Sequence, residues 1–308
     1  MISIILPFHN EKENLPLLLK DIEEIQKSKI ISDSIEVVLV DDGSTDSWKD
    51  NLVYPSSISV ITASFAKRRG KGNALALGVE KSHGEIIVFM DADLQDNPHD
   101  LPLFLDKIKS GAMLVNGVRE QRHDSHLIRY YSRIFNGILR LFFSSPFHDI
   151  NCGFKVMRRQ LFQSFQLYGN NFRLLPLATY LKGFSVAEVS IHNQKRIYGH
   201  SKFGPGKAFV GFIDLVTAYF LFRFSEQPFH FFGTIGGILC GIGLIINSVL
   251  VFERIAYGEL LYRRPMLWFG ILFIIVGIQI GMTGIIGELI VHYFKGSSGS
   301  VRERKHTS

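Results

Sequence analysis

Short apolar runs alternate with helical patterns as far as Gly117. Five of the runs predict strands: Ile2–Leu6, Ile35–Val40, Ile58–Ala63, Glu85–Met90 and Ala112–Gly117. Between them, apolar residues at helical spacing predict three helices. The first follows an N-cap at Asn14 and has Pro16 in its first turn, and the second covers Gly72–Ser82. The third starts at Asn97-Pro98 and carries Leu101, Phe104, Leu105 and Ile108. This order predicts an α/β fold with a doubly wound, mostly parallel sheet that is buried on both faces.

Two long runs without a charged residue follow in the second half of the chain. They cover Gln227–Phe252 and Pro265–Gly287, and each exceeds the roughly 18 to 20 apolar residues that cross a bilayer. Buried helices of a soluble protein are the alternative, but two such runs in tandem favour two transmembrane helices joined by a short loop. Arg and aromatic residues mix at helical spacing in Leu127–Phe143 and Lys207–Phe224, which predicts amphipathic helices at the membrane interface, with an ordinary core helix as the alternative.

These patterns divide the chain into four parts. We expect a cytoplasmic α/β domain over residues 1–205 with an interface helix at 127–145, a second interface helix over 206–226, a transmembrane region over 227–294, and a basic cytoplasmic tail over 295–308. The opening residues MISIILPFHNEKEN lack the basic region of a signal peptide, which favours a cytoplasmic start. The glycine pairs Gly237/Gly241 and Gly277/Gly281 predict close helix packing, either within one chain or in a homo-oligomer. Glu288 is a candidate for a contact between the two helices.

The amino-acid composition gives no support for a nucleic-acid partner, a disulfide framework or a zinc site. The 34 Lys and Arg residues stand against 28 Asp and Glu residues, and this modest net charge of +6 does not argue for a nucleic-acid partner. Two cysteines, Cys152 and Cys240, are too few for a disulfide framework. The 11 histidines show no spacing typical of a zinc site.

Carboxylates gather where three predicted strands end, in the segments PFHNEKEN, DDGSTD and DADLQD. Ligands of open α/β sheets bind beyond the carboxyl ends of the strands, so these segments are candidates for a site. Asp91 and Asp93, with Gln95 as an ambiguous neighbour, suit a Mg²⁺ ion that shares its shell with substrate phosphates. Asp96 is better explained as part of the start of the following helix.

Asp41 and Asp42 have two interpretations. They can accept hydrogen bonds from a base or ribose, or they can belong to an Asp-Gly turn capped by Ser44 and Thr45.

Five segments together resemble the nucleotide-sugar glycosyltransferases of family 2, which have the GT-A fold: LPFHNEKENL, VDDGSTD, KRRGKGNAL, MDADLQDNP and NCGFKVMRR. KRIYGHSKFG, followed by a surface helix and two spans, is similar to the polyprenyl-phosphate branch of that family. The branch includes dolichol-phosphate mannosyltransferases and bacterial undecaprenyl-phosphate glycosyltransferases. The resemblance covers residues 1–295, and it departs from the family at Arg68 and Arg69, where other members often carry an Asn.

The resemblance implies roles for individual residues. Those implied to bind the nucleotide are Pro7, Asn10, Glu11, Asp41, Asp42 and Lys71. Those implied to hold a Mg²⁺ or Mn²⁺ ion and the donor diphosphate are Asp91, Asp93 and Gln95. A mobile loop is implied to close on phosphate groups through Arg196, Ser201 and Lys202.

The remaining implied residues belong to the acceptor side and the sugar. Arg119 and Arg133 are expected to reach the lipid phosphate, with Arg129 as a rival for the second position. Asp149 is expected to face the sugar, first as an orienting or electrostatic group and second as a base. A phosphate-monoester nucleophile, with a second pKa of about 6, is mostly ionised at neutral pH, so a strong base is less necessary than for a sugar hydroxyl.

The resulting hypothesis is an inverting, metal-dependent enzyme that moves one hexose from a nucleotide sugar, UDP-linked in preference to GDP-mannose, to polyprenyl phosphate at the cytoplasmic membrane face. One alternative is a processive polysaccharide synthase, which usually carries a Gln-x-x-Arg-Trp motif that neither Trp48 nor Trp268 completes here. The other is a membrane scaffold without catalytic activity.

Overall fold

The computed structural model describes residues 1–119, 146–165, 171–192, 227–258 and 265–299, together with the single positions 137, 217, 220 and 224. The chain divides into two compact units, Met1–Asp214 and Leu215–Ser308. The predicted interface helices lie almost entirely outside the described residues. The same holds for five residues of the sequence-based site: Arg129, Arg133, Arg196, Ser201 and Lys202.

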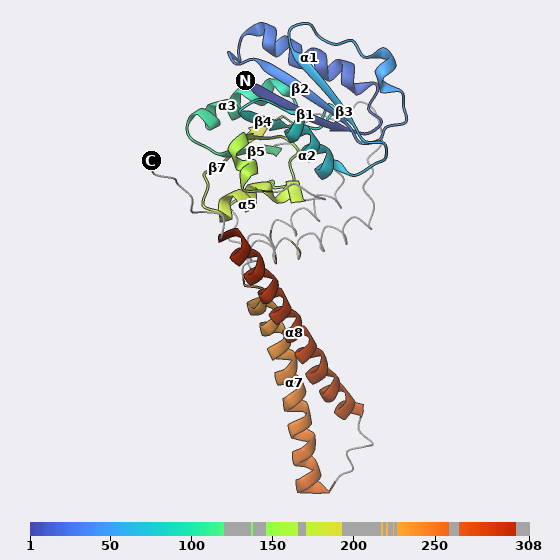
Figure 1. The fold of residues 1–308 in the computed structure, drawn as a ribbon, viewed down its shortest axis with the longest axis vertical. Coiled ribbons are helices and arrows are strands. Elements are labelled where there is room, and N and C mark those ends of the chain that lie inside the picture. Colours follow the sequence, from blue (N-terminus) through green and yellow to red (C-terminus); the bar gives the residue numbers. More distant parts are fainter. Residues whose placement is uncertain are drawn as a thin grey trace, which may run out of the picture. The chain divides into compact units, whose positions relative to one another are not determined.

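A sheet of seven strands forms the centre of the first unit (Figure 1). The strands are β1 (Ile2–Phe8), β2 (Ile35–Asp41), β3 (Ser59–Ser64), β4 (Ile86–Phe89), β5 (Leu114–Arg119), β6 (Lys155–Arg158) and β7 (Val186–Ile191). Their order is β3-β2-β1-β4-β6-β5-β7, and β6 alone runs antiparallel to both of its neighbours. The five predicted strands are all present, with ends shifted by at most two residues, and the predicted doubly wound, mostly parallel sheet is confirmed.

Helices cover both faces of this sheet. Side chains alternate along each strand, so successive residues of β1 enter different cores. Ile4 and Leu6 pack with helices α1 (Asn14–Ser28) and α3 (Leu101–Lys109). Ile5 packs with α2 (Lys71–Lys81) and α5 (Leu175–Leu181) on the other face.

The start of α1 differs from its prediction. Asn14 is the first helical residue and not the N-cap, because Glu13 takes the cap position without a side-chain hydrogen bond. The Asn14 side chain instead donates its amide to Glu11 Oε2 at 2.5 Å.

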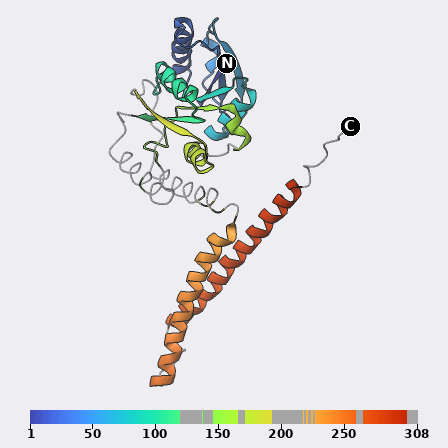
Figure 2. The same cartoon turned by 90° about the vertical axis from the view of Figure 1, so that its left-hand side faces the viewer.

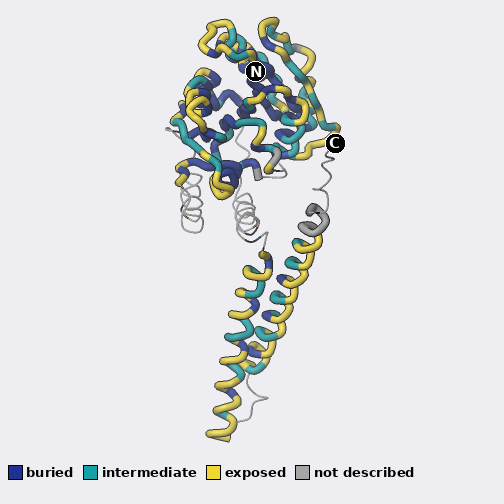
Figure 3. Tube along the Cα trace, turned by 60° about the vertical axis from the view of Figure 1, so that its left-hand side comes forward, coloured by how far each residue is buried: buried dark blue, intermediate teal, exposed yellow. Residues whose placement is uncertain are grey.

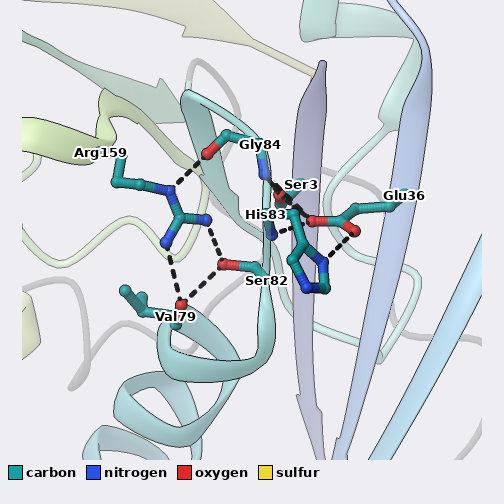
Figure 4. Close-up of polar contacts among 7 residues, drawn as sticks. All are labelled: Ser3, Glu36, Val79, Ser82, His83, Gly84 and Arg159. Atoms are coloured by element: carbon teal, nitrogen blue, oxygen red, sulfur yellow. Dashed lines mark hydrogen bonds and ion pairs between the residues drawn. The ribbon is translucent and has the colours of Figure 1, made fainter.

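A buried polar network closes the amino ends of β1, β2 and β4 (Figure 4). The carboxylate of Glu36 is only 3% exposed and accepts hydrogen bonds from Ser3 Oγ, from the backbone N–H groups of His83 and Gly84, and from the His83 ring. Burial raises the pKa of Glu36, but these hydrogen bonds outweigh burial and hold its pKa below the usual value. Arg159, the residue that follows β6, donates to Gly84 O at 2.6 Å and to Ser82 Oγ at 2.7 Å, and so connects the end of α2 to the end of β6.

Two long apolar helices dominate the second unit. α7 (Pro228–Tyr257) and α8 (Pro265–Gly299) lie side by side (Figure 2), and the spans Pro228–Tyr257 and Pro265–Tyr293 each have a mean hydropathy of 2.3. Both are long and apolar enough to cross a membrane. Large apolar side chains face outward along them, including Ile245 at 65% exposure and Leu289 at 64%, whereas the sheet of the first unit is mostly buried (Figure 3). This contrast supports membrane anchoring.

The helix contact uses the predicted Gly277 of α8, where a Cβ would lie 2.6 Å from Gly236 O, but on α7 it uses other glycines than those predicted. A Cβ on Gly236 would lie 2.4 Å from Gly277 O, and a Cβ on Gly243 would lie 2.5 Å from Gly270 O, so the two helices pack antiparallel. Among the described residues, and apart from the adjacent backbone of α7 itself, no atom lies within 4 Å of the Cβ positions of Gly237 and Gly241. Packing of that pair within one chain is therefore wrong, because Gly236 and Gly243 occupy the packed face of α7 at a spacing of two turns. Packing of Gly237 and Gly241 in a homo-oligomer stays a prediction.

The predicted helix contact of Glu288 is present. Its Oε2 accepts a hydrogen bond from Phe229 N at 3.2 Å, in the first turn of α7.

Candidate active site

The predicted site segments meet at one edge of the sheet. β1, β2 and β4 are parallel, and β6 runs antiparallel to both β4 and β5. The carboxyl ends of β1, β2, β4 and β5 therefore share an edge with the beginning of β6.

Asp41 and Asp42 lie at the end of β2, and both carboxylates bind groups within the chain. Asp41 accepts hydrogen bonds from Ser44 N at 2.7 Å and from Trp48 Nε1 at 3.0 Å. Asp42 accepts from the backbone N–H groups of Arg69 at 2.6 Å and Gly70 at 3.0 Å, just before α2. The predicted Asp-Gly turn is therefore present. The loop with Arg68 and Arg69, where other family members often carry an Asn, is held by hydrogen bonds from its backbone to the Asp42 carboxylate.

The loop after β1 is joined to this turn. Asn10 has a left-handed backbone with φ of 58°, and its Oδ1 accepts a hydrogen bond from Thr45 N at 2.8 Å. Glu11 follows it, bound to Asn14. Pro7 is buried within β1, beyond the last residue of β1 that pairs with β4, so its missing N–H leaves the β4 side intact.

Lys71 and Asp91 form an ion pair between the first residue of α2 and the loop after β4. The Lys71 ammonium donates to Asp91 Oδ1, and both side chains are partly exposed, at 30% and 36%. Burial raises the pKa of Asp91, but attraction to Lys71, with smaller contributions from Arg119 and Lys155, outweighs burial and holds the pKa below its usual range. Asp91 therefore carries its negative charge at neutral pH.

Asp93 and Asp96 complete a group of carboxylates around a strained turn. Asp93 is buried and accepts a hydrogen bond from Gln95 N at 3.2 Å, while the intervening Leu94 has a left-handed φ of 59°. Burial and the charges of Asp91 and Asp93 raise the pKa of Asp96 to about 7.

The assignment of Asp96 to the following helix was wrong. Asn97 is the cap there, since its Oδ1 accepts from His99 N at 3.0 Å. The Asp96 carboxylate instead turns back and accepts from Asp91 N at 3.3 Å.

The chemistry of these groups fits a divalent ion that a substrate helps to bind. Among the described residues, no cluster of three or more His, Cys, Asp or Glu side chains is arranged to hold a metal alone. Mg²⁺ commonly takes only one or two carboxylates and completes its shell with phosphates and water. Burial first, and then the negative charges of Asp91 and Asp93, raise the pKa of Asp96, and a bound cation would offset those charges.

Arg119 and Asp149 form a second ion pair at the same edge. Arg119 ends β5, and its Nε and Nη2 atoms lie 2.8 and 3.3 Å from the two carboxylate oxygens of Asp149. The Asp149 side chain is 3% exposed and the Arg119 side chain is 20% exposed. The structure thus brings together two residues to which the sequence assigned different partners.

The loop before β6 links the two ion pairs. A Cβ on Gly153 would lie 2.7 Å from Asp91 Oδ2, so the backbone that follows Asp149 packs directly against Asp91. Lys155 is 1% exposed, and burial lowers its pKa to about 8. Sequence reasoning assigned no role to Asn116, Gly153 or Lys155, although a lysine inside the apolar run FKVM was a usable signal.

Comparison with known proteins defines the class. Residues 3–165 match the family model described as glycosyl transferase family 2. The chain therefore belongs to glycosyl transferase family 2, as the motifs predicted, and it is a transferase enzyme.

Full-length relatives have names within one branch of the family. The chain is 27% identical to dodecaprenyl-phosphate galacturonate synthase of Rhizobium johnstonii, over 95% of this chain and 88% of that protein. It is 28% identical to undecaprenyl-phosphate 4-deoxy-4-formamido-L-arabinose transferase of Shewanella sediminis, over 94% of this chain and 86% of that protein. These relatives are polyprenyl-phosphate glycosyltransferases by name, in agreement with the predicted branch.

Solved structures support the fold. A crystal structure of glucosyl-3-phosphoglycerate synthase from Mycobacterium tuberculosis, in complex with Mn²⁺, uridine diphosphate and phosphoglyceric acid, matches with a TM-score of 0.55 at 19% identity over 72% of this chain and 77% of that chain. Mannosyl-3-phosphoglycerate synthase from Rubrobacter xylanophilus matches with a TM-score of 0.56 at 17% identity over 71% and 74%. The predicted GT-A type of sheet is confirmed at this level.

Proposed function

We propose that this protein transfers a single sugar from a nucleotide sugar to polyprenyl phosphate, at the cytoplasmic face of the membrane to which α7 and α8 anchor it. The observation that carries the proposal is the meeting of the Lys71–Asp91 and Arg119–Asp149 pairs at one sheet edge, in a chain with two apolar helices. The names of the relatives in two bacteria support the acceptor class. A UDP-linked hexose is the favoured donor, followed by GDP-mannose.

Asp91, Asp93 and Gln95 would hold a Mg²⁺ or Mn²⁺ ion, and such an ion neutralises the charge that develops on a departing nucleoside diphosphate. Lys71 begins α2 and contributes a second positive charge to the diphosphate. Asp41, Asp42, Asn10, Glu11 and Pro7 lie on the β1 and β2 side of the edge, where the nucleotide would bind.

The acceptor side requires little proton transfer. A lipid phosphate monoester is mostly ionised at neutral pH, since its second pKa is about 6. Attack of its oxygen on the anomeric carbon, on the face opposite the leaving diphosphate, would invert the configuration. Asp149 is bound by Arg119 through both oxygens, so we assign it to orientation and electrostatic support.

The decisive experiment uses the full chain in detergent with undecaprenyl phosphate and a panel of nucleotide sugars, with Mn²⁺ or Mg²⁺ and with EDTA. Mass spectrometry should detect a lipid-linked monosaccharide that depends on the metal. Asp93→Ala should lower the rate at least about tenfold, as expected for the loss of a metal ligand, while Asp106→Ala, an exposed carboxylate on α3, should not. A polymeric product would favour a processive polysaccharide synthase. Absence of nucleotide-sugar binding in calorimetry would favour a membrane scaffold without catalytic activity.

A further inference from the structure

Three backbone carbonyls in the segment between Asp149 and Gly153 are bound by side chains from two strands. Asn116 Nδ2 donates to Asp149 O at 2.9 Å. Lys155 Nζ donates to Ile150 O at 3.1 Å and also to Cys152 O. Because carbonyl oxygens are spread along the segment, these bonds fix its path and not only one residue.

The two donors form a cross-strand pair. Asn116 on β5 and Lys155 on β6 are direct partners in the antiparallel register, so their side chains lie on the same face of the sheet. They are 0% and 1% exposed. Both strands are held by the sheet, which makes them a rigid support for the segment.

Neither residue suits this position for packing alone. A buried lysine is rare, because its charge must leave water, and an apolar side chain of the same size often gives equal or greater stability. Asn116 Oδ1 is buried and has no hydrogen-bond partner within the described parts of the chain, which is itself costly. What both residues supply is donors to the segment.

The supported segment contacts both charged pairs of the site. Asp149 begins it and binds Arg119, and Gly153 ends it against Asp91 at a distance that leaves no room for a Cβ. A shift of this backbone would therefore move the Arg119–Asp149 pair relative to Asp91.

We infer that Asn116 and Lys155 are positioning residues for sugar transfer, which act by holding the backbone of residues 149–153 between the two ion pairs. The inference rests on the proposed function for its kinetic consequence only. The mechanical part, that these side chains hold the segment, stands on the hydrogen bonds alone.

Hydrogen–deuterium exchange of the full chain in detergent tests the mechanical part. Lys155→Met keeps the length of the side chain and removes its donors. Exchange of the Cys152 amide, which donates to Asp149 O at 3.3 Å, should become about tenfold faster, while amides of β1 and β2 stay unchanged. Lys182→Met is the matched control, since Lys182 is exposed and binds a single carbonyl, Ser164 O, at 2.7 Å.

The kinetic test uses the same variants with undecaprenyl phosphate and the donor that the wild type accepts. Lys155→Met should lower kcat about tenfold to a hundredfold, with a donor KM within about threefold of wild type and no loss of melting temperature. Asn116→Leu should also lower kcat, and it is the variant to measure if Lys155→Met does not fold. Lys155→Arg, which retains donors, should recover part of the loss.

Unchanged exchange at Cys152, a kcat within twofold of wild type, or faster exchange throughout the domain would each overturn the inference. If the wild type transfers no sugar from any donor, the proposed function fails, and the exchange result still decides whether the two side chains hold the segment.

Discussion

Replacement of Gly153 by alanine tests the geometry of the site most directly. The new Cβ would lie 2.7 Å from Asp91 Oδ2 and 3.0 Å from Asp91 Cγ. The Asp91 carboxylate must retreat by about 0.7 Å to restore an ordinary contact of 3.4 Å. Since Lys71 binds the other oxygen, this displacement also disturbs the ion pair.

The expected effect on activity is large and the expected effect on stability is small. Misplacement of a reacting group by about 1 Å can lower a rate about a hundredfold, so we expect kcat/KM to fall between tenfold and a hundredfold. Gly153 has no left-handed backbone, and a short side chain can rotate away, so the free energy of unfolding should change by less than about 1 kcal/mol.

The assay is the initial rate of sugar transfer to undecaprenyl phosphate at saturating Mn²⁺, together with a thermal melt. Gly237→Ala is the control, because no described atom outside the adjacent backbone of α7 lies within 4 Å of its Cβ position. A kcat/KM within threefold of wild type for Gly153→Ala, or a loss explained entirely by unfolding, would refute the proposed contact with Asp91.

Three further predictions concern stability. Glu36→Gln should destabilise the protein by about 2 kcal/mol at pH 7, because the substitution removes the charged acceptor of several hydrogen bonds. The pKa of Glu36 is lowered in the folded state, so the stability that its carboxylate provides is present above the unfolded pKa and is lost as the pH falls through the folded pKa. In thermal melts from pH 7 to pH 4, the melting temperatures of the variant and the wild type should therefore converge. Gly236→Ala should loosen the α7–α8 contact and lower the melting temperature in detergent, whereas Gly237→Ala should not; equal melting temperatures would contradict the observed packing. Glu288→Ala should lower the melting temperature by removing the acceptor for Phe229 N, at a cost of about 1 kcal/mol, while Glu288→Gln should retain most of the stability.

The elements of the first unit follow closely from the sequence. Runs such as Ile35–Val40 became strands with nearly the predicted ends, since apolar runs bounded by turn residues carry a local signal. β6 and β7 were not predicted. β6 comprises only four residues, Lys155–Arg158, and includes two charged side chains, so no clear apolar pattern marks it.

The sequence allowed us to predict which residues lie at the candidate site, but not which of their side chains contact one another. The carboxylates at the ends of β2 and β4 were identified from their position after apolar runs. Asp96 was misassigned because a carboxylate before Asn-Pro has the same local pattern whether it caps the helix or turns back toward Asp91. Lys155 received no role because its acceptors, Ile150 O and Cys152 O, lie in a loop whose path is determined only by the tertiary structure.

The sequence by itself determined the first five strands and the helices between them, the two apolar helices and the chemical groups available at the strand ends. These properties depend on periodicity, length and residue type, which are local. Only the tertiary structure decided that Lys71 binds Asp91, that Arg119 binds Asp149, and that Gly236 and not Gly237 faces α8. Such contacts join residues 20 to 41 positions apart in the chain. They depend on the register of the strands and on the rotation of the helices about their axes. A shift of register or rotation by one residue would change these contacts, but the local sequence pattern does not reveal it.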